Sequence, residues 1–452
     1  MRRSLTIGAG LAVAVAALSL LLPYRPVYDP WGWLVWGREL AQLELATATG
    51  PSWKPLPVFV CAPLSWLGEA APGAWLLVAR SGWLLAPVLA GWLAARLAGP
   101  DVGRWRLAAA GLAGLSVALN ADAFTPPLRQ FTGGLSEPLL VALVLGAVAL
   151  ALERRPRGAL WLGVAASLLR PECWPFLAVW AWREVRREPA LRSRALAAAV
   201  LVPLAWFVPD LVAAGNPLEG SETARQGGLE IGEIAEVAAR GLAAPLVAVW
   251  VGVALLLGEL RNRAEGDRVL GVLLIGAAGW VTLVAAMAVV GYAGLPRFLA
   301  PATAAISVVG AVGLARAGSK AFSAGEPRPL LALVAVAALF VGAVGFGLRA
   351  SHLPGDLDTI KAQTRSQEDL ATLANRLGAD RLLTCNRTVR VTQLLAQTAL
   401  AWELDQPIES IHPIRHPQYG VALSTKPLPG KLLAREARWR ATQLPCPWQT
   451  AP

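Results

Sequence analysis

The chain has 452 residues, of which 55% are hydrophobic and 16% are charged, and its mean hydropathy is +0.50. A soluble protein carries about 25% charged residues, so this composition excludes an ordinary soluble enzyme. The formal net charge of +11 does not indicate a nucleic-acid partner. Most of the arginines lie in short segments between apolar stretches, where positive charge sets membrane orientation and meets anionic lipid head groups. We predict an all-α polytopic membrane protein.

Apolar stretches long enough to cross a bilayer, about 20 residues each, recur through residues 1–350. The first follows Arg2 and Arg3, and no small-residue cleavage site comes directly after it, so we predict an uncleaved helix rather than a signal peptide. The pattern predicts about eleven transmembrane helices. They lie near residues 5–22, 73–98, 106–120, 135–152, 158–170, 172–184, 196–213, 241–260, 269–290, 296–317 and 329–349. The fifth and sixth are short and are separated by Arg170-Pro171, which favours kinked or incomplete spans.

The basic residues between these stretches predict the orientation. With the N-terminus inside, every basic cluster falls on the inner face, as the positive-inside rule requires. The clusters are Arg2/Arg3, Arg104/Arg106, Arg154/Arg155/Arg157, Arg183/Arg186/Arg187/Arg192/Arg194, Arg261/Arg263/Arg268 and Arg316/Lys320/Arg328. The exported segments are then 23–72, 121–134, 214–240, 291–295 and the tail from residue 350. We therefore predict a transmembrane domain, residues 1–350, and a small extracytoplasmic α/β domain, residues 351–452.

The outer loop at residues 23–72 is predicted to lie against the membrane surface. Residues 30–46 have apolar side chains at helical spacing, with tryptophans among them, which is typical of a helix in the membrane interface. Residues 55–69 are too short to span the bilayer and contain three prolines, so we expect a juxtamembrane or re-entrant helix on the outer side. Long irregular outer segments with a few charges are where a binding site is expected.

The tail is polar and differs in character from the rest of the chain. We expect helices at residues 366–378 and 389–403 and a short strand at 381–385. Proline-rich turns follow residue 406. This mixture of elements predicts the small α/β domain.

The four cysteines fall into two pairs. Cys61 and Cys173 lie in apolar segments and are expected to be small core residues. Cys385 and Cys446 lie in the polar tail, and they can form a disulfide if the tail is outside the cytoplasm.

All three histidines of the chain lie in the tail. Any base in the membrane region must therefore be a carboxylate. His412 and His416 have helical spacing, but Pro413 and Pro417 break the helix that a metal site would need. We predict no metal site and no cofactor, and the sequence leaves a requirement for a divalent ion open.

Two residues of the outer loop are candidates for chemistry. Asp29, in the stretch YDPWGW, precedes Pro30 and fits either a helix N-cap or a general base at the outer face. Lys54, in the stretch SWKPLP, fits either an interfacial lysine that reaches water or a rigid loop that presents an ammonium group to a phosphate. The residue types alone leave both choices open.

Further charged residues lie inside or at the ends of apolar stretches. A charge deep in a bilayer costs about 2.5–3.5 kcal/mol on insertion scales, so such residues usually face a polar cavity. They either form structural ion pairs, for instance Arg170 with Glu172, or bind an anionic lipid-linked ligand. The candidates are Arg80, Arg129, Glu137, Arg170, Glu172 and Arg297, and all but Arg80 are predicted on the outer half of the membrane.

The ordered set of motifs resembles the GT-C superfamily, which comprises polytopic glycosyltransferases that use polyprenyl-phosphate sugars, such as protein O-mannosyltransferases and lipid A aminoarabinose transferases. A first helix is followed directly by an outer loop that contains Asp29, and KPLPVFVCAPLSWLG at residues 54–68 is similar to the family's His- or Lys-Pro-Pro-Leu stretch. Stretches similar to later helix starts are ARSGWLLAPVLA (79–90), SEPLLVALVLG (136–146), LLRPE (168–172) and PRFLAPA (296–302). The resemblance covers roughly residues 1–320.

The resemblance implies a mechanism. Asp29 would take the proton from an acceptor hydroxyl, and the sugar would leave its lipid phosphate with inversion at the anomeric carbon. The residues implied for the leaving phosphate are Lys54 and one or more of Arg129, Arg170 and Arg297, with Arg80, Glu137 and Glu172 in support. Asp-Pro replaces the Asp-Glu of many members and KPLP departs from the usual stretch, so the sugar and the acceptor stay open.

The resemblance also implies partners and a location. The partners would be a polyprenyl-phosphate sugar donor, membrane lipids and an acceptor that is a lipid, a glycan or a protein. A composition rich in Ala, Leu, Gly and Arg favours a bacterial source, and hence the cytoplasmic membrane of a bacterium.

Two other functions compete with the transferase. A transporter or flippase for an anionic isoprenoid-linked lipid shares the basic outer cavity, but it needs a site reachable from both faces and often has two matching halves. No such repeat is evident, and the charges gather at one lip of the membrane. A non-enzymatic assembly protein that uses its tail to bind a partner has no need of the Asp29 and Lys54 pair.

Overall fold

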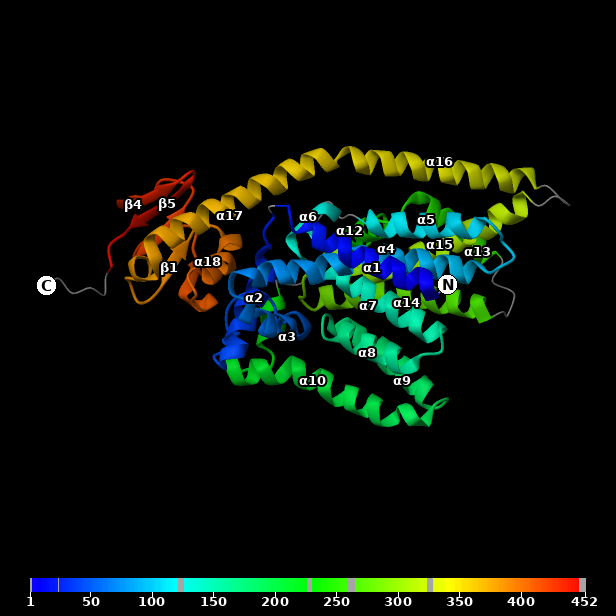
Figure 1. The fold of residues 1–452 in the computed structure, drawn as a ribbon, viewed down its shortest axis with the longest axis horizontal. Coiled ribbons are helices and arrows are strands. Elements are labelled where there is room, and N and C mark those ends of the chain that lie inside the picture. The colour runs from blue at the N-terminus through cyan, green and yellow to red at the C-terminus, as the bar shows by residue number, and fades with distance from the viewer. Residues whose placement is uncertain are drawn as a thin grey trace.

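The computed structural model describes residues 2–22, 24–120, 126–225, 230–258, 265–322 and 328–446, which form a helical bundle with a small mixed domain at one end (Figure 1). The bundle contains α1 (Arg2–Ser19), α2 (Tyr28–Gln42), α3 (Pro55–Leu64), η1 (Ser65–Ala70), α4 (Ala71–Ala98), α5 (Trp105–Ala118), α6 (Pro127–Gly133), α7 (Glu137–Leu152), α8 (Pro156–Ser167), η2 (Pro171–Cys173), α9 (Trp174–Val185), η3 (Pro189–Leu191), α10 (Arg192–Ala214), α11 (Glu219–Ala224), α12 (Ile231–Leu242), α13 (Val247–Leu257), α14 (Glu265–Val289), η4 (Pro296–Leu299), α15 (Ala300–Ala321) and α16 (Pro329–Ser351). In Figure 1, α16 and α17 (Leu353–Leu382) run end to end along the bundle and lead into the small domain.

Helix α15 lies inside the bundle, in contact with α4, α5, α7, α13 and α14, and nearly all of its residues are buried. Glycines allow α13 and α15 to approach closely, because a Cβ on Gly252 would overlap the backbone of Gly310. Close backbone approach at small residues is the usual way in which helices pack within a membrane. The packing fixes the N-terminal end of α15, which Pro296 and Arg297 precede.

The number of membrane spans differs from the prediction. Five helical runs are long and apolar enough to cross a membrane, and up to seven are if each of two bent helix pairs counts as one span. The five are Pro55–Ala98, Pro189–Ala214, Asp267–Val289, Pro296–Ala321 and Pro329–Leu382. The bent pairs are α6 with α7 and α12 with α13, at angles of 95° and 90°. The predicted count of about eleven is therefore not confirmed.

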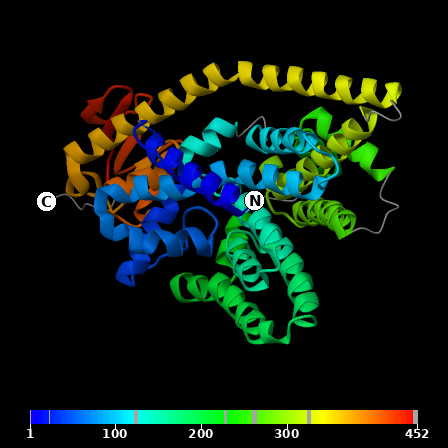
Figure 2. The ribbon, with the colours of Figure 1, turned by 45° about the vertical axis from the view of Figure 1, so that its right-hand side comes forward.

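Short and broken helices account for the difference. Helices α8 and α9 have 12 residues each, about 18 Å at 1.5 Å per residue, which is too short for a hydrocarbon core of about 30 Å. The prediction that residues 158–170 and 172–184 are incomplete is confirmed. Figure 2 shows α8, α9 and α10 extending away from the rest of the bundle. Parts of the predicted span at 241–260 and of the outer segment at 121–134 lie outside the described residues.

Helix α2 is expected to present its tryptophans to the membrane interface, and the structure buries them inside the protein instead. The helix exists, but Trp31, Trp33 and Trp36 are at most 2% exposed. Trp33 packs edge-on against Trp75 of α4, with ring centroids 5.3 Å apart, and Trp31 lies near Trp402 of the C-terminal domain. The tryptophans are buried because α3, α4 and the C-terminal domain together cover the helix.

Glu39 of α2 makes the stability of the fold depend on pH. The side chain is 5% exposed, and one carboxylate oxygen accepts a hydrogen bond from the amide of Ala46 at 3.1 Å. Burial raises the pKa of Glu39 to about 7, against the smaller opposing effects of that hydrogen bond and of Arg38. Because the folded pKa lies above the unfolded one, ionisation opposes folding: stability is greatest below about pH 4.5 and is lost as the pH rises through about 7.

We therefore expect Glu39→Gln to stabilise the protein at pH 8 by about 3 kcal/mol and to change its stability far less at pH 5. The glutamine retains an oxygen for the Ala46 amide but carries no charge. Thermal unfolding of the full chain in detergent across pH 5–8 measures the effect. Glu44→Gln is the matched control, since Glu44 is exposed on the same loop. A gain for Glu39→Gln of equal size at both pH values would contradict the assignment.

The C-terminal domain contains a five-stranded mixed sheet. The strands are β1 (Val389–Val391), β2 (Ile411–Pro413), β3 (Val421–Ser424), β4 (Lys431–Glu436) and β5 (Trp439–Gln443), in the order β2-β1-β3-β5-β4. Strand β1 is parallel to β2 and β3, whereas β5 is antiparallel to β3 and β4. Helices α17 and α18 (Gln397–Glu403) pack with the sheet, so the predicted small α/β domain is present.

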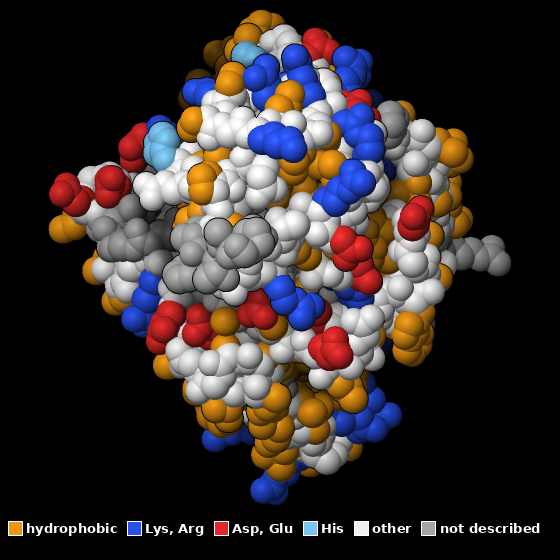
Figure 3. Space-filling view, turned by 90° about the vertical axis from the view of Figure 1, so that its left-hand side faces the viewer, with side chains coloured by type: hydrophobic (Ala, Val, Ile, Leu, Met, Phe, Trp, Pro, Cys, Tyr) orange, Lys and Arg blue, Asp and Glu red, His pale blue; other side chains and the backbone are white. Residues whose placement is uncertain are grey.

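Two elements predicted in this domain are wrong. The strand expected at 381–385 is instead the end of α17, which changes direction at Gly378 (φ 73°) and ends at Leu382. The helix expected at 389–403 begins only at Gln397, because Val389 and Val391 are β-branched and form the buried strand β1. Figure 3 views this end of the molecule: charged side chains of both signs spread over the domain, and hydrophobic side chains gather toward the lower edge.

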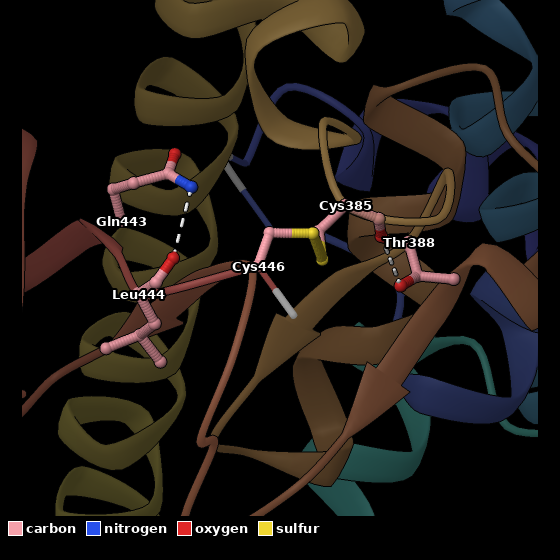
Figure 4. Close-up of a disulfide and its surroundings, with 5 residues drawn as sticks. All are labelled: Cys385, Thr388, Gln443, Leu444 and Cys446. Atoms are coloured by element: carbon pink, nitrogen blue, oxygen red, sulfur yellow. Dashed lines mark hydrogen bonds between the residues drawn. A yellow bond between two sulfur atoms is a disulfide. The ribbon is translucent and has the colours of Figure 1, made fainter. Parts of the chain in front are cut away.

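A disulfide joins Cys385 and Cys446, with the two Cα atoms 5.8 Å apart (Figure 4). It fastens the end of the last strand to the turn before β1, where Thr388 Oγ1 donates a hydrogen bond to the carbonyl of Cys385 at 3.0 Å. The predicted pairing is present. Cys61 and Cys173 are free and buried, as expected for small core residues.

Candidate functional site

A cluster of charged side chains surrounds Glu137, the first residue of α7, which is 2% exposed. Its Oε1 accepts hydrogen bonds from Arg170 Nη2 at 3.2 Å and from Arg297 Nε at 3.3 Å. Lys54 Nζ lies 3.9 Å from the same oxygen. Arg170 Nη1 also donates to Glu172 Oε1 at 3.2 Å. We call these five residues the Glu137 cluster; they comprise three cations and two carboxylates.

Helix starts bring these residues together. Lys54 precedes α3, Glu137 begins α7, Arg170 precedes η2 and α9, and Arg297 lies in η4 just before α15. A proline lies beside each of them, at the first or second position of its helix, where a missing amide hydrogen costs nothing. The backbone amides at helix starts carry partial positive charge, so this end of the bundle favours a bound anion.

Aromatic rings and a serine complete the cluster. The guanidinium of Arg170 stacks over the Phe298 ring at 3.5 Å, and the ammonium of Lys54 lies 5.1 Å from the Trp33 ring centroid. Lys54 Nζ donates to Ser136 Oγ at 3.2 Å. The rings exclude water from the cations, and so strengthen their attraction for an anion. Sequence reasoning missed Trp33, Ser136 and Phe298, although each directly adjoins or lies near a predicted charge.

Asp29 lies in the first turn of α2 and is half-buried. The N-cap interpretation is wrong, because α2 begins one residue earlier and its N-cap is Val27. Among the described residues, Asp29 has no hydrogen bond and no ion pair. Its charge nevertheless reaches the cluster: burial lowers the pKa of Lys54, and Glu137 and Asp29 oppose that effect. Trp33, one turn further along α2, borders Lys54 with its ring, so Asp29 lies on the part of α2 that faces the cluster.

Arg129 and Arg80 are not part of the Glu137 cluster. Arg129, on α6, is half-buried and close enough to Arg297 for the two positive charges to repel. Arg80, on α4, is fully buried and donates to the Ser19 carbonyl at 2.8 Å and to the Thr132 carbonyl at 3.3 Å. Arg80 thus ties α1 and α6 to α4, which is a structural role.

A small, partly open pocket lies beside the cluster. Arg297 belongs to both. Most of the wall is apolar, with Trp83 of α4 and Val141 of α7 among its residues, and Asn120 and Gln130 supply polar groups. A mostly apolar pocket next to cations suits an amphipathic anion whose charged group binds the cations and whose apolar part lies in the pocket.

The described residues contain no group of three or more His, Cys, Asp or Glu side chains that could bind a metal ion. His412 lies in β2 and His416 follows this strand, and both side chains are exposed.

The fold and the site together define a polytopic membrane protein, built on a fold that two solved structures share. Its structure is similar to crystal structures of ArnT from Cupriavidus metallidurans, one in the apo state and one bound to undecaprenyl phosphate. The TM-scores are 0.54 and 0.52 and the sequence identities are 16% and 14%, over 97% of both chains in each case. No protein-family model and no curated protein matches the chain. At these identities the similarity concerns the fold.

Proposed function

We propose that the protein is a membrane glycosyltransferase that moves a sugar from a polyprenyl-phosphate donor to an acceptor hydroxyl at the outer membrane face. One observation carries the proposal: Asp29, which has no hydrogen bond or ion pair among the described residues, lies on α2 one turn before Trp33, whose ring borders Lys54 of the Glu137 cluster. The described side chains of that cluster are three cations and two carboxylates. The similarity of the fold to an ArnT structure that contains undecaprenyl phosphate supports the choice of donor.

The chemistry needs a base and a stabilised leaving group. Asp29 takes the proton from the acceptor hydroxyl as its oxygen forms a bond to the anomeric carbon of the sugar. The bond between that carbon and the phosphate oxygen breaks, and the electron pair leaves with the phosphate. Lys54, Arg170 and Arg297 stabilise the charge that develops there. Attack from the side opposite the phosphate inverts the anomeric centre.

The pocket beside Arg297 suits the lipid part of the donor. Its apolar wall accepts the first isoprenoid units, and Arg297 at its edge reaches the phosphate. A long isoprenoid does not leave the bilayer, so the phosphate must be bound at head-group depth. That depth agrees with a cluster built at helix starts. We place this end of the bundle, with the C-terminal domain, outside the cytoplasmic membrane of a bacterium, and the N-terminus inside.

A transporter or flippase would need the charged site to be reachable from both faces. The cluster instead lies where four helices start and borders α2, the helix that carries Asp29, which favours the transferase. The same purified protein tests both functions. It is incubated with undecaprenyl-phosphate hexoses and pentoses together with bacterial lipid, glycan and protein fractions that supply acceptor hydroxyls, and released undecaprenyl phosphate is detected by mass spectrometry. Release of undecaprenyl phosphate supports the transferase. Movement of intact donor across proteoliposomes without release would support the transporter.

A further inference from the structure

The C-terminal domain lies directly against the residue before Asp29. Tyr28 Oη donates a hydrogen bond to Gln397 Oε1 at 3.0 Å, and Thr398 Oγ1 donates to the carbonyl of Tyr28 at 2.8 Å. Gln397 Nε2 in turn donates to the carbonyl of Ile411, in the sheet, at 2.8 Å. Two successive residues of α18 therefore fix both the side chain and the backbone of Tyr28.

A second set of contacts lies on either side of this pair. Gln367 of α17 donates from Nε2 to the Pro26 carbonyl at 3.2 Å, and its Oε1 accepts from Trp31 Nε1 at 3.3 Å. Residues 26, 28 and 31 are thus all bonded to the C-terminal domain, and Asp29 lies between them. Ion pairs with the same domain, Arg25 with Glu403 and Arg38 with Asp405, both at 2.7 Å, lie farther out along the chain.

The residues of the C-terminal domain that make the two bonds to Tyr28 are buried, so the geometry that they impose is specific. Gln397 is 4% exposed and Thr398 is fully buried. A Cβ on Gly32 would overlap the ring of Pro51 and touch Thr398, which leaves no room for the start of α2 to shift toward the domain. From the side of the bundle, the Val27 amide donates to the Gly133 carbonyl at 3.1 Å. The backbone at Asp29 is therefore fixed from two sides, while its own side chain is left without a bond among the described residues.

The hydroxyl of Tyr28 is a hydrogen-bond donor whose protonation state does not change with pH in the working range. Burial, with a contribution from the charge of Asp29, raises the pKa of Tyr28 to about 12, so its hydroxyl stays protonated and donates to Gln397 at any working pH. A buried hydroxyl with a single good acceptor contributes more to specific geometry than to net stability.

We propose that the C-terminal domain is a positioning element for the base, with Gln397 and Thr398 as positioning residues that hold Asp29 toward the Glu137 cluster. This inference rests on the proposed function for the role of Asp29. A general base acts only within hydrogen-bond reach of the proton that it takes. A shift of about 1 Å, even one caused far from the chemistry, can cost about 10²-fold in rate.

Thr398→Val tests the inference, because it keeps the shape of the side chain and removes the hydrogen bond to Tyr28. We expect kcat to fall by about 10-fold or more, with KM for the polyprenyl-phosphate donor unchanged, because Lys54, Arg170 and Arg297 are untouched. Tyr28→Phe removes the other bond and should act in the same direction. The control is Arg376→Gln. Arg376 pairs with Glu436 at 3.2 Å within the same domain and, among the described residues, makes no hydrogen bond or ion pair with α2, so its loss should leave kcat unchanged.

Two further measurements separate positioning from general damage. In an Asp29→Asn background, Thr398→Val should reduce the residual turnover no further, since no base remains to be positioned. Hydrogen exchange of the amides at residues 28–32 should be faster in Thr398→Val than in the wild type or Arg376→Gln, whether or not the protein transfers sugar. Unchanged exchange would overturn the inference by itself, and leave the proposed function standing. An equal fractional loss of turnover with and without Asp29, or a raised donor KM, would also overturn it.

Discussion

Replacing Asp29 by asparagine abolishes sugar transfer, with an expected rate loss of about 10²–10⁴-fold, the usual contribution of a general base. Asparagine has the same shape but accepts no proton. Every histidine of the chain lies in the tail, so no imidazole of the membrane region can substitute. Release of undecaprenyl phosphate from a sugar-loaded donor measures the loss. The fold should be unaffected, because Asp29 makes no hydrogen bond and no ion pair among the described residues.

The variant must still bind the donor. Lys54, Arg170 and Arg297 remain in place, so we expect undecaprenyl phosphate to raise the melting temperature of Asp29→Asn as much as that of the wild type. Glu44→Gln is the matched control: it removes one exposed carboxylate from the same outer loop and should keep full activity. Near-normal turnover in Asp29→Asn would remove the aspartate from the mechanism.

Much of the site was predictable because its charged residues lie beside the prolines that mark the starts of helices in this sequence. Charges are rare in the apolar stretches, and Lys54, Glu137, Arg170 and Arg297 each lie beside a proline at a helix start. Those four residues do meet at one point. The sequence could not say that one oxygen of Glu137 would contact all three cations, because that depends on how four helices converge. The sequence did not distinguish Arg80 and Arg129 from the residues of the cluster, although Arg80 only links helices through hydrogen bonds.

The fold was predictable to a lesser degree, for reasons that also concern particular residues. Apolar composition identifies helices in a membrane but does not show where they bend, and the break between α6 and α7 follows from Gly133 and Gly134 as much as from any polar residue. The tryptophans of α2 resemble a membrane belt when the tail is not considered. They are buried because α18, more than 350 residues later, covers them. Strand β1 pairs in parallel with β2 and β3, which lie later in the chain, so a short stretch of sequence does not reveal this pairing.

Glu137→Gln should lower the stability of the protein by about 3–5 kcal/mol, because removing one partner of a buried ion pair leaves the others uncompensated. Here a single carboxylate oxygen contacts three cations, Lys54, Arg170 and Arg297, so its loss removes an ion pair from each of them. Thermal unfolding in detergent measures the effect. The matched control is Glu172→Gln, because Glu172 is also buried but has Arg170 as its single ion-pair partner among the described residues, so its loss should cost less.

The same substitution discriminates between a structural network and a phosphate site. If the cluster binds the phosphate of the donor, an added anion can take over the charge that Glu137 supplied. Undecaprenyl phosphate should then raise the melting temperature of Glu137→Gln by more than it raises that of the wild type, since in the wild type the phosphate must share the cations with Glu137. In Glu172→Gln the extra gain should be smaller. If undecaprenyl phosphate restores the melting temperature of neither variant, the cations serve only to bind the two carboxylates. The leaving phosphate then has to be stabilised elsewhere.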